Sequence, residues 1–291
     1  MMDAQARKLT AAIQERAADT ACPDGSTRRT IDLGPAADIA ERHSVSVREV
    51  EIAALRAGVI PRRYLRNFGS LGAEGQIALL SAAVAIIGMG GLGGVIARNL
   101  ARVGVGRLVL VDGDVFSEDN LNRQEFCTED NIGVPKVEAA AREIARINRA
   151  VQVTAVNKLV GRDELIELLR GCTVAVDALD NIPSRFALSD AASAVGVPLV
   201  HGSVAGFVGQ VATMRPDAGG FTAIFGDRRD LPERGVEVSL GNLPGVVGTV
   251  ASLQTVEVIK LLTNKGEPIS GRLLFMDLES CVFDFFDVKV E

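Results

Sequence analysis

Tryptophan is absent from this 291-residue chain, which has one tyrosine, two histidines and four cysteines. The cysteines, Cys22, Cys127, Cys172 and Cys281, lie far apart and form no C-x-x-C pair. Their spacing therefore predicts neither a disulfide framework nor a structural zinc site. No stretch approaches the roughly 20 uninterrupted apolar residues of a membrane span, and the N-terminus has no apolar signal-peptide core. We expect a cytoplasmic protein with no membrane partner.

An excess of positive charge is also missing, because the formal net charge is −6. Binding to a phosphate backbone usually needs a basic field, so we expect no nucleic-acid partner. The chain is 47% hydrophobic. At this length it can bury the core of one large α/β domain or of two small ones.

Residues 1–60 differ from the rest, being rich in Ala, Arg and Glu with two helical patterns separated by a turn-like stretch at 22–30. Ser46 has the position of an N-cap, with Glu49 three residues later as in a capping box. Gly58 and the proline that follows can end this helix. The pattern predicts a small helical extension. A helix-turn-helix DNA reader is disfavoured, since no basic face accompanies it.

From residue 83 onward, apolar runs alternate with amphipathic stretches, which is typical of strand-helix units around a parallel sheet. Later apolar segments follow one another without such helices, which predicts antiparallel strands. We therefore expect an α/β, Rossmann-like mixed sheet with a parallel nucleotide-binding half and an antiparallel C-terminal half. The expected parallel strands are 83–87, 107–112, 151–156, 173–178 and 198–202, the later strands lie within 208–216, 273–278 and 282–290, and the main helices are 136–148, 163–170 and 244–263.

A glycine-rich motif, GMGGLG, directly follows the first apolar run and directly precedes a helical pattern. Gly88, Gly90 and Gly93 fit G-x-G-x-x-G, and Gly91 lies within the motif. Such glycines let a phosphate approach the backbone at a helix N-terminus. Asp112, 19 residues after Gly93, can hydrogen-bond ribose hydroxyls. The motif by itself predicts an adenine nucleotide and fits NAD as well as ATP.

The next segment, DGDVFSEDNLNRQEF, favours ATP, because it is polar where a dehydrogenase needs an apolar nicotinamide cleft. Two cations, Arg123 and Lys136, suit a triphosphate. A second polar group, Asp180 with Asn181, follows the run at 173–178. The carboxyl ends of parallel strands are where open α/β sheets bind ligands, and a carboxylate near phosphates suggests Mg²⁺.

These segments together resemble the MoeB/ThiF/HesA family of ubiquitin-activating-like sulfur-carrier adenylyltransferases. The resemblance runs from about residue 63 to the C-terminus, and RYLRN, GMGGLG, DGDVFSEDNLNRQ, IGVPK, DALDN and SLQTVEVIK occur in the family's order. It implies an ATP-binding adenylation domain over 61–291, with a crossover loop at about 216–242 and a helical extension over 1–60.

The resemblance also implies residue roles. The expected catalytic residues are Arg66, Arg123, Lys136 and Asp180, with Arg123 and Lys136 on the phosphates and Asp180 on Mg²⁺. In the family, the arginine that matches Arg66 enters the partner subunit's site, so a homodimer is implied. The expected nucleotide-binding residues are Gly88, Gly90, Gly91, Gly93, Asp112, Asp114, Asn120, Gln124 and Asn181.

The family's reaction is the attack of a carrier's C-terminal glycine carboxylate on the α-phosphate of ATP, and the carrier is a small ubiquitin-like protein ending in Gly-Gly. This sequence departs from the family's pattern at two places, and each departure limits the activity or cofactors that we expect. Of the cysteine pairs that bind structural zinc in many relatives, only Cys281 is present, so we predict no structural zinc. The crossover loop has no cysteine, so adenylation is expected to be the whole activity. A tRNA threonylcarbamoyladenosine dehydratase-type enzyme, a non-catalytic ATP-binding scaffold and an NAD oxidoreductase are the alternatives.

Overall fold

An eight-stranded mixed sheet forms the centre of the computed structural model, which describes residues 4–217, 220–232 and 235–288. The strand order is β11-β10-β9-β8-β7-β4-β5-β6. Strands β8 to β6 in this order are parallel, and β9, β10 and β11 pair antiparallel, which confirms the predicted mixed sheet. The strands are β4 (Ala83–Ile87), β5 (Arg107–Val111), β6 (Gln152–Val156), β7 (Val174–Asp177), β8 (Leu199–Ala205), β9 (Val208–Met214), β10 (Arg272–Asp277) and β11 (Val282–Asp287).

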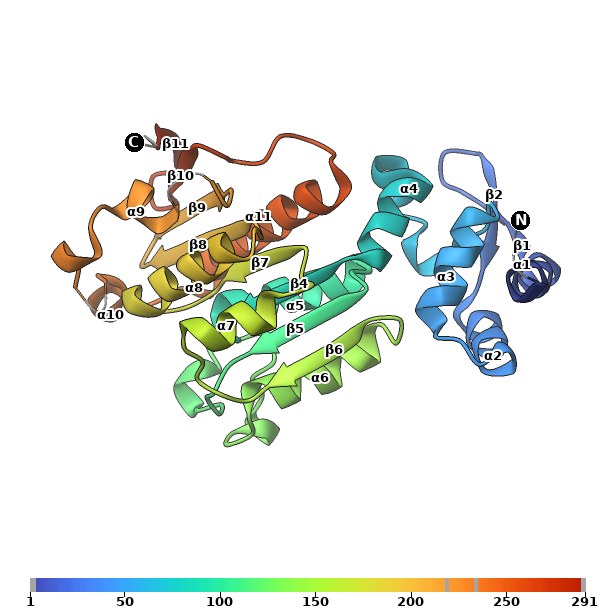
Figure 1. Ribbon diagram of the computed structural model, residues 1–291, viewed down its shortest axis with the longest axis horizontal. Coiled ribbons are helices and arrows are strands. Elements are labelled where there is room, and N and C mark those ends of the chain that lie inside the picture. Colours follow the sequence, from blue (N-terminus) through green and yellow to red (C-terminus); the bar gives the residue numbers. More distant parts are fainter. Residues whose placement is uncertain (1–3, 218–219, 233–234, 289–291) are drawn as a thin grey trace.

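Helices cover both faces of this sheet (Figure 1). Alternate residues of β4 point to opposite faces: Val84 and Ile86 join a core with α5, α6 and α11, while Ala85 and Ile87 join a core with α7, α8 and α9. Burial on both faces explains why the parallel strands are continuous apolar runs in the sequence. The helices are α4 (Phe68–Ser81), α5 (Gly91–Val103), α6 (Lys136–Ile147), α7 (Arg162–Leu169), α8 (Ile182–Ala194), α9 (Gly220–Phe225), α10 (Glu237–Leu240) and α11 (Pro244–Thr263).

Helix α11 is the one described helix that is long and apolar enough to cross a membrane by length and composition. Half of it is buried, and it packs against α5, β8 and β9. Its buried Glu257 accepts hydrogen bonds from the Thr213 hydroxyl at 2.7 Å and the Ile269 amide at 2.6 Å. The apolar composition of α11 is therefore explained by its packing within this fold.

The N-terminal residues form a separate module with its own small core. It contains α1 (Ala4–Arg16), β1 (Ala18–Ala21), β2 (Thr27–Ile31), α2 (Leu33–His43), α3 (Val47–Arg56) and β3 (Ile60–Pro61). The predicted capping box is present, since the Glu49 amide donates to Ser46 and the Ser46 amide donates to Glu49. The three-stranded sheet β1-β2-β3 is an addition that the sequence patterns did not predict.

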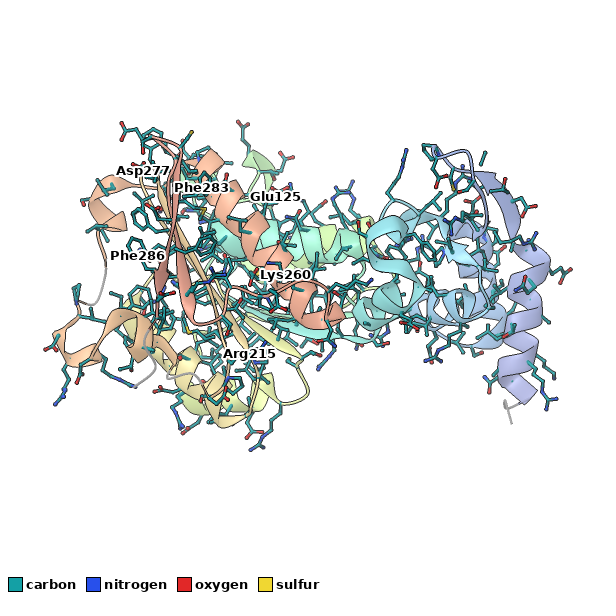
Figure 2. The ribbon with its side chains drawn as sticks, turned by 90° about the horizontal axis from the view of Figure 1, so that it is seen from above. Glu125, Arg215, Lys260, Asp277, Phe283 and Phe286 are labelled. Atoms are coloured by element: carbon teal, nitrogen blue, oxygen red, sulfur yellow. The ribbon has the colours of Figure 1, made fainter. Side chains whose placement is uncertain are left out.

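Helix α3 packs against α1, α2 and α4 and therefore contacts protein on several sides. Figure 2 shows the module at one end of the long axis, with Phe283 and Phe286 of β11 at the other end.

A buried polar cluster joins the module to the main domain. Glu51 of α3, only 2% exposed, accepts a hydrogen bond from the Tyr64 hydroxyl at 3.0 Å and faces the Arg63 guanidinium at 3.4 Å. Asn148, which follows α6, donates to the same hydroxyl at 2.9 Å. Burial raises the pKa of Glu51 to about 7, although Arg63 and the Tyr64 hydrogen bond act in the opposite direction.

This cluster predicts a specific dependence of stability on pH. Because the pKa of Glu51 is higher in the folded protein than its ordinary value of 4.5, the folded state holds a proton that the unfolded chain loses first. The free energy of unfolding should therefore fall as pH rises from about 5 to 8.5, by about 2 to 3 kcal/mol from this group. In Glu51→Gln this part of the fall should be absent, as measured by urea unfolding at both pH values. The exposed Glu41→Gln is the control; equal pH dependence in all three proteins would contradict the prediction.

Candidate active site

The carboxyl ends of β4, β5 and β7 meet at one edge of the sheet, where the chain leaves β4 for β5 on one side and returns to β7 on the other. Such switch points are where open α/β sheets bind ligands. A cavity of about 680 Å³ lies there, within the size range of small-ligand sites. Ten of the predicted residues line it: Gly88, Gly90, Gly91, Asp112, Asp114, Arg123, Gln124, Lys136, Asp180 and Asn181.

The glycine loop, residues 88–93, passes so close to neighbouring backbone atoms that two of its positions have no room for a side chain. Gly88 has φ +94°, and a Cβ there would lie 2.4 Å from the Ala178 carbonyl oxygen. A Cβ on Gly93 would lie 1.9 Å from the Gly88 carbonyl oxygen. Gly93 therefore serves the close packing of α5 on the loop, while Gly90 and Gly91 line the cavity itself.

Asp112 fastens the glycine loop to the end of β5. One of its carboxylate oxygens accepts a hydrogen bond from the Met89 amide at 2.6 Å, and the other accepts from the Asp114 amide at 2.8 Å. Each oxygen retains a further lone pair for a ligand hydroxyl. Asp112 is thus held in place before any ligand arrives.

Both predicted cations face the cavity. The Lys136 side chain is 8% exposed and pairs with the Asp114 carboxylate at 3.0 Å. Arg123 uses its Nη1 atom to donate to the Asp119 carbonyl and the Asn122 side chain, each at 2.8 Å. No described residue accepts a hydrogen bond from its Nη2, so the guanidinium keeps donors for an anion.

Asn120 and Gln124 have different positions. Asn120 does not line the cavity. Its side-chain oxygen accepts a hydrogen bond from the Ser117 amide at 3.3 Å and so caps the N-terminus of the short 3-10 helix η2 (Glu118–Asn120). Gln124 lines the cavity, and its Oε1 atom is buried without a hydrogen-bond partner among the described residues. A buried, unpartnered carbonyl oxygen next to a cavity is suited to accept a donor from a ligand.

Asp180 and Asn181 lie at the start of α8. Asn181 caps the helix by accepting a hydrogen bond from the Ser184 amide at 2.9 Å, and Asp180 is exposed beside it. Asp177, fully buried, accepts from the Leu179 amide at 3.0 Å. These bonds fix the loop that carries Asp180.

His201 contacts Asp177, the buried residue that holds this loop. Its Nδ1 atom lies 2.7 Å from the Asp177 carboxylate, and both side chains are fully buried. The rings of Phe221 and Phe225 pack nearly perpendicular to the imidazole ring. Burial lowers the pKa of His201 more than the Asp177 hydrogen bond raises it, so the ring is neutral at pH 7. Its position agrees with a structural role.

Sequence reasoning missed five polar residues that line the cavity, Asp119, Lys158, Ser184, Arg185 and Asn242. Lys158 follows β6 at the same carboxyl edge, so the rule that located Asp180 was sufficient to find it. Arg185 donates to the Leu179 carbonyl at 2.6 Å and lies 3.7 Å from Asp177. Asn242 ends the expected crossover loop, of which residues 218–219 and 233–234 lie outside the described residues.

Arg66 does not reach the cavity of its own chain. It is exposed, in the turn between the 3-10 helix η1 (Arg62–Tyr64) and α4, and has no hydrogen bond or ion pair with a described residue. Its neighbour Asn67 donates to Gln76, which donates to the Val103 carbonyl at the C-terminal end of α5. The cavity lies at the N-terminal end of this 13-residue helix, about 20 Å away.

Metal ligands are sparse in the described part of the chain. No group of three or more His, Cys, Asp or Glu side chains there is arranged to hold a metal ion, and all four cysteines are free thiols. The expected lack of structural zinc stays a prediction.

The fold and the cavity define a nucleotide-binding α/β protein, and comparison with known proteins gives its family. A model of the ThiF family matches residues 62–290, and the chain belongs to this family. The N-terminal module, which ends at Pro61, lies outside the match.

Among curated relatives, the SAMP-activating enzyme E1 of Haloferax volcanii is 40% identical over 227 residues, which cover 76% of this chain and 83% of that protein. The molybdopterin-synthase adenylyltransferase of Salmonella typhimurium is 36% identical, covering 72% of this chain and 84% of that protein. The crystal structure of Escherichia coli MccB with ATP shares the fold, with a TM-score of 0.69 at 20% identity, covering 79% of this chain and 72% of that one.

The glycine loop provides a test of the cavity as a nucleotide site. Gly93→Ala should lower the free energy of unfolding by about 2 kcal/mol or more, because its Cβ overlaps the Gly88 carbonyl, and should abolish ATP binding. Gly90→Ala is the matched variant, since its Cβ would meet only Gln124, at 3.8 Å. It should keep wild-type stability and lose ATP affinity only, as measured by urea unfolding and calorimetric titration. Wild-type stability and affinity in Gly93→Ala would refute this assignment.

Proposed function

We propose that this chain is an ATP-dependent adenylyltransferase that activates the C-terminal glycine carboxylate of a small ubiquitin-like sulfur carrier. The observation that carries the proposal is the cavity at the carboxyl edge, which combines a glycine loop with Arg123, Lys136 and acidic side chains. The curated relatives support it, because their names describe an activating enzyme and an adenylyltransferase.

In the proposed reaction a carrier carboxylate oxygen attacks the α-phosphorus of ATP. A new C–O–P link forms, the bond from the α-phosphorus to the bridging oxygen breaks, and pyrophosphate leaves with the electron pair. This chemistry requires positioning and charge neutralisation rather than a protein nucleophile. The anchored Asp112 is suited to hold the ribose, and Arg123 and Lys136 to hold the phosphates.

Mg²⁺ fits the donor set of this cavity. Mg²⁺ in nucleotide sites takes one or two carboxylates and completes its coordination with phosphate oxygens and water. The cavity offers Asp180 at its mouth and Asp114 beside Lys136, without a third clustered ligand of the kind zinc prefers. We assign Asp180 to the ion, which would neutralise phosphate charge when bound with ATP.

The partner assignments extend this proposal. The carrier is proposed to be a protein ending in Gly-Gly, as the resemblance to the MoeB/ThiF/HesA family implies. The enzyme is a homodimer, because Arg66 lies at the opposite edge of the sheet from its own cavity and is available to a second copy. We also propose that residues 61–291 form the adenylation domain, that residues 1–60 are an extension to it, and that the protein acts in the cytoplasm.

Pyrophosphate exchange tests the activity. The wild-type protein should incorporate labelled pyrophosphate into ATP only when a Gly-Gly carrier and Mg²⁺ are present. Asp180→Ala should reduce exchange about 100-fold or more, since it removes charge neutralisation at the phosphates. Asp163→Ala, which removes a carboxylate that is 96% exposed, should exchange normally. Full exchange by Asp180→Ala would overturn the metal assignment, and no exchange by the wild type with any such carrier would overturn the function.

Complementation tests the shared site. Arg66→Ala and Asp180→Ala homodimers should each keep only a small residual exchange rate, since an arginine at a developing phosphate charge is worth ~10³-fold or more in related chemistry. In a mixed dimer one site has both residues and the other has neither. Random pairing makes about half of all dimers mixed, so activity should recover to about a quarter of wild type. No recovery, with mixed dimers confirmed by native mass spectrometry, would show that Arg66 does not act across subunits.

A further inference from the structure

The segment that carries Arg66 has little structure of its own. The arginine segment, residues 62–68, consists of η1, a turn and the first residue of α4. Its own backbone hydrogen bonds are short-range, such as those that the Leu65 amide donates to the Arg62 carbonyl and the Asn67 amide donates to the Tyr64 carbonyl. A single helical turn is unstable in isolation, because its nucleation costs more than one hydrogen bond returns. Its conformation must therefore come from neighbouring elements.

The N-terminal module, residues 4–61, supplies many of those neighbours. Asp32, at the N-terminus of α2, pairs with Arg62 at 3.1 Å. Glu51 uses one carboxylate oxygen for Arg63 and the other for the Tyr64 hydroxyl. At the far end of the segment, the Arg28 guanidinium of β2 lies 5.6 Å from the centre of the Phe68 ring. The module thus contacts the arginine segment on both sides of Arg66.

The main domain holds the opposite side of the same segment. The Tyr64 ring is fully buried against Gly104, where a Cβ would lie 2.7 Å from ring atoms. Asn148 donates to the Tyr64 hydroxyl, and its side-chain oxygen accepts from Arg63. A direct link between the two parts, from Arg48 to the Gly106 carbonyl at 2.9 Å, fixes the module against the start of β5.

Arg66 is the exception within this segment. Arg62, Arg63, Tyr64, Asn67 and Phe68 all have side-chain partners, whereas Arg66 is exposed and has no hydrogen bond or ion pair with a described residue. Arg66 is therefore the guanidinium of this segment that is available to another molecule.

We propose that the N-terminal module is a positioning element that fixes the arginine segment, through Glu51 and Tyr64, so that Arg66 is oriented for the active site of a second copy. Glu51 is a positioning residue in this arrangement, not a catalytic one. An arginine held in advance loses less conformational entropy when it meets the phosphates, and a displacement of about 1 Å can cost 10²-fold in rate. The inference rests on the proposed adenylation and on the role of Arg66 in it.

A double-mutant experiment separates positioning from general stability. Glu51→Leu removes both carboxylate contacts and should lower the exchange rate about tenfold, while ATP affinity stays at the wild-type value because the cavity lies at the other edge of the sheet. In an Arg66→Ala background the same substitution should cause no further loss. Glu41→Leu, an exposed glutamate of the same module, is the control and should match wild type. Equal losses in both backgrounds would overturn the proposal.

A second readout does not depend on activity. Hydrogen exchange at the Leu65 and Asn67 amides should become about tenfold faster in Glu51→Leu, while the Gly94 amide of α5 remains unchanged. Tyr64→Phe, which keeps the ring against Gly104 and removes the hydroxyl, should show the same pattern and serves if Glu51→Leu does not fold. Unchanged exchange at Leu65 and Asn67 in a folded variant would refute the positioning role even if the adenylation proposal holds. Faster exchange in a protein without adenylation activity would leave the positioning intact and refute the function.

Discussion

The close crossing of α5 over the loop after β4 is the constraint on which the nucleotide edge depends. A side chain at Gly93 would overlap the Gly88 carbonyl at 1.9 Å, so helix and loop touch backbone to backbone. This contact brings the unpaired amides of the helix N-terminus to the cavity, where they favour a phosphate. The turn that makes the crossing possible requires φ +94° at Gly88, a conformation that side chains disfavour. Two glycines therefore determine where an anion can bind.

The polar groups of the cavity are held by protein contacts before a ligand binds. Asp112 is oriented by the Met89 and Asp114 amides, and Lys136 by the Asp114 carboxylate. Below Asp180, the buried Asp177 is balanced by Arg185 and hydrogen-bonded to a neutral His201. Charges at this edge thus need little reorganisation when phosphates arrive, which is the condition under which electrostatic stabilisation is most effective.

The sequence predicted the elements whose pattern reflects burial. β4 and α11 match the expected ranges residue for residue, because a strand covered on both faces and a helix in the core leave long apolar signals. The small sheet of the N-terminal module was not predicted, because β1 and β2 are short and mostly exposed. At the site, the glycine motif and its following acid were sufficient to identify the loop. Asn242 was not identifiable, because only the folded crossover brings it to the cavity.

The cavity and the arginine segment lie at opposite edges of the sheet. The carboxyl edge carries the cavity, whereas Tyr64, Gly104 and Gly106 place the arginine segment and the N-terminal module at the amino edge of β4 and β5. An added module at the amino edge cannot block nucleotide entry in its own chain, since the length of α5 separates the two. In the proposed dimer, it would act on catalysis through the residues that it presents to the other copy. Because two-fold symmetry would apply this effect twice, one module in each chain would be enough to organise both active sites of the proposed dimer.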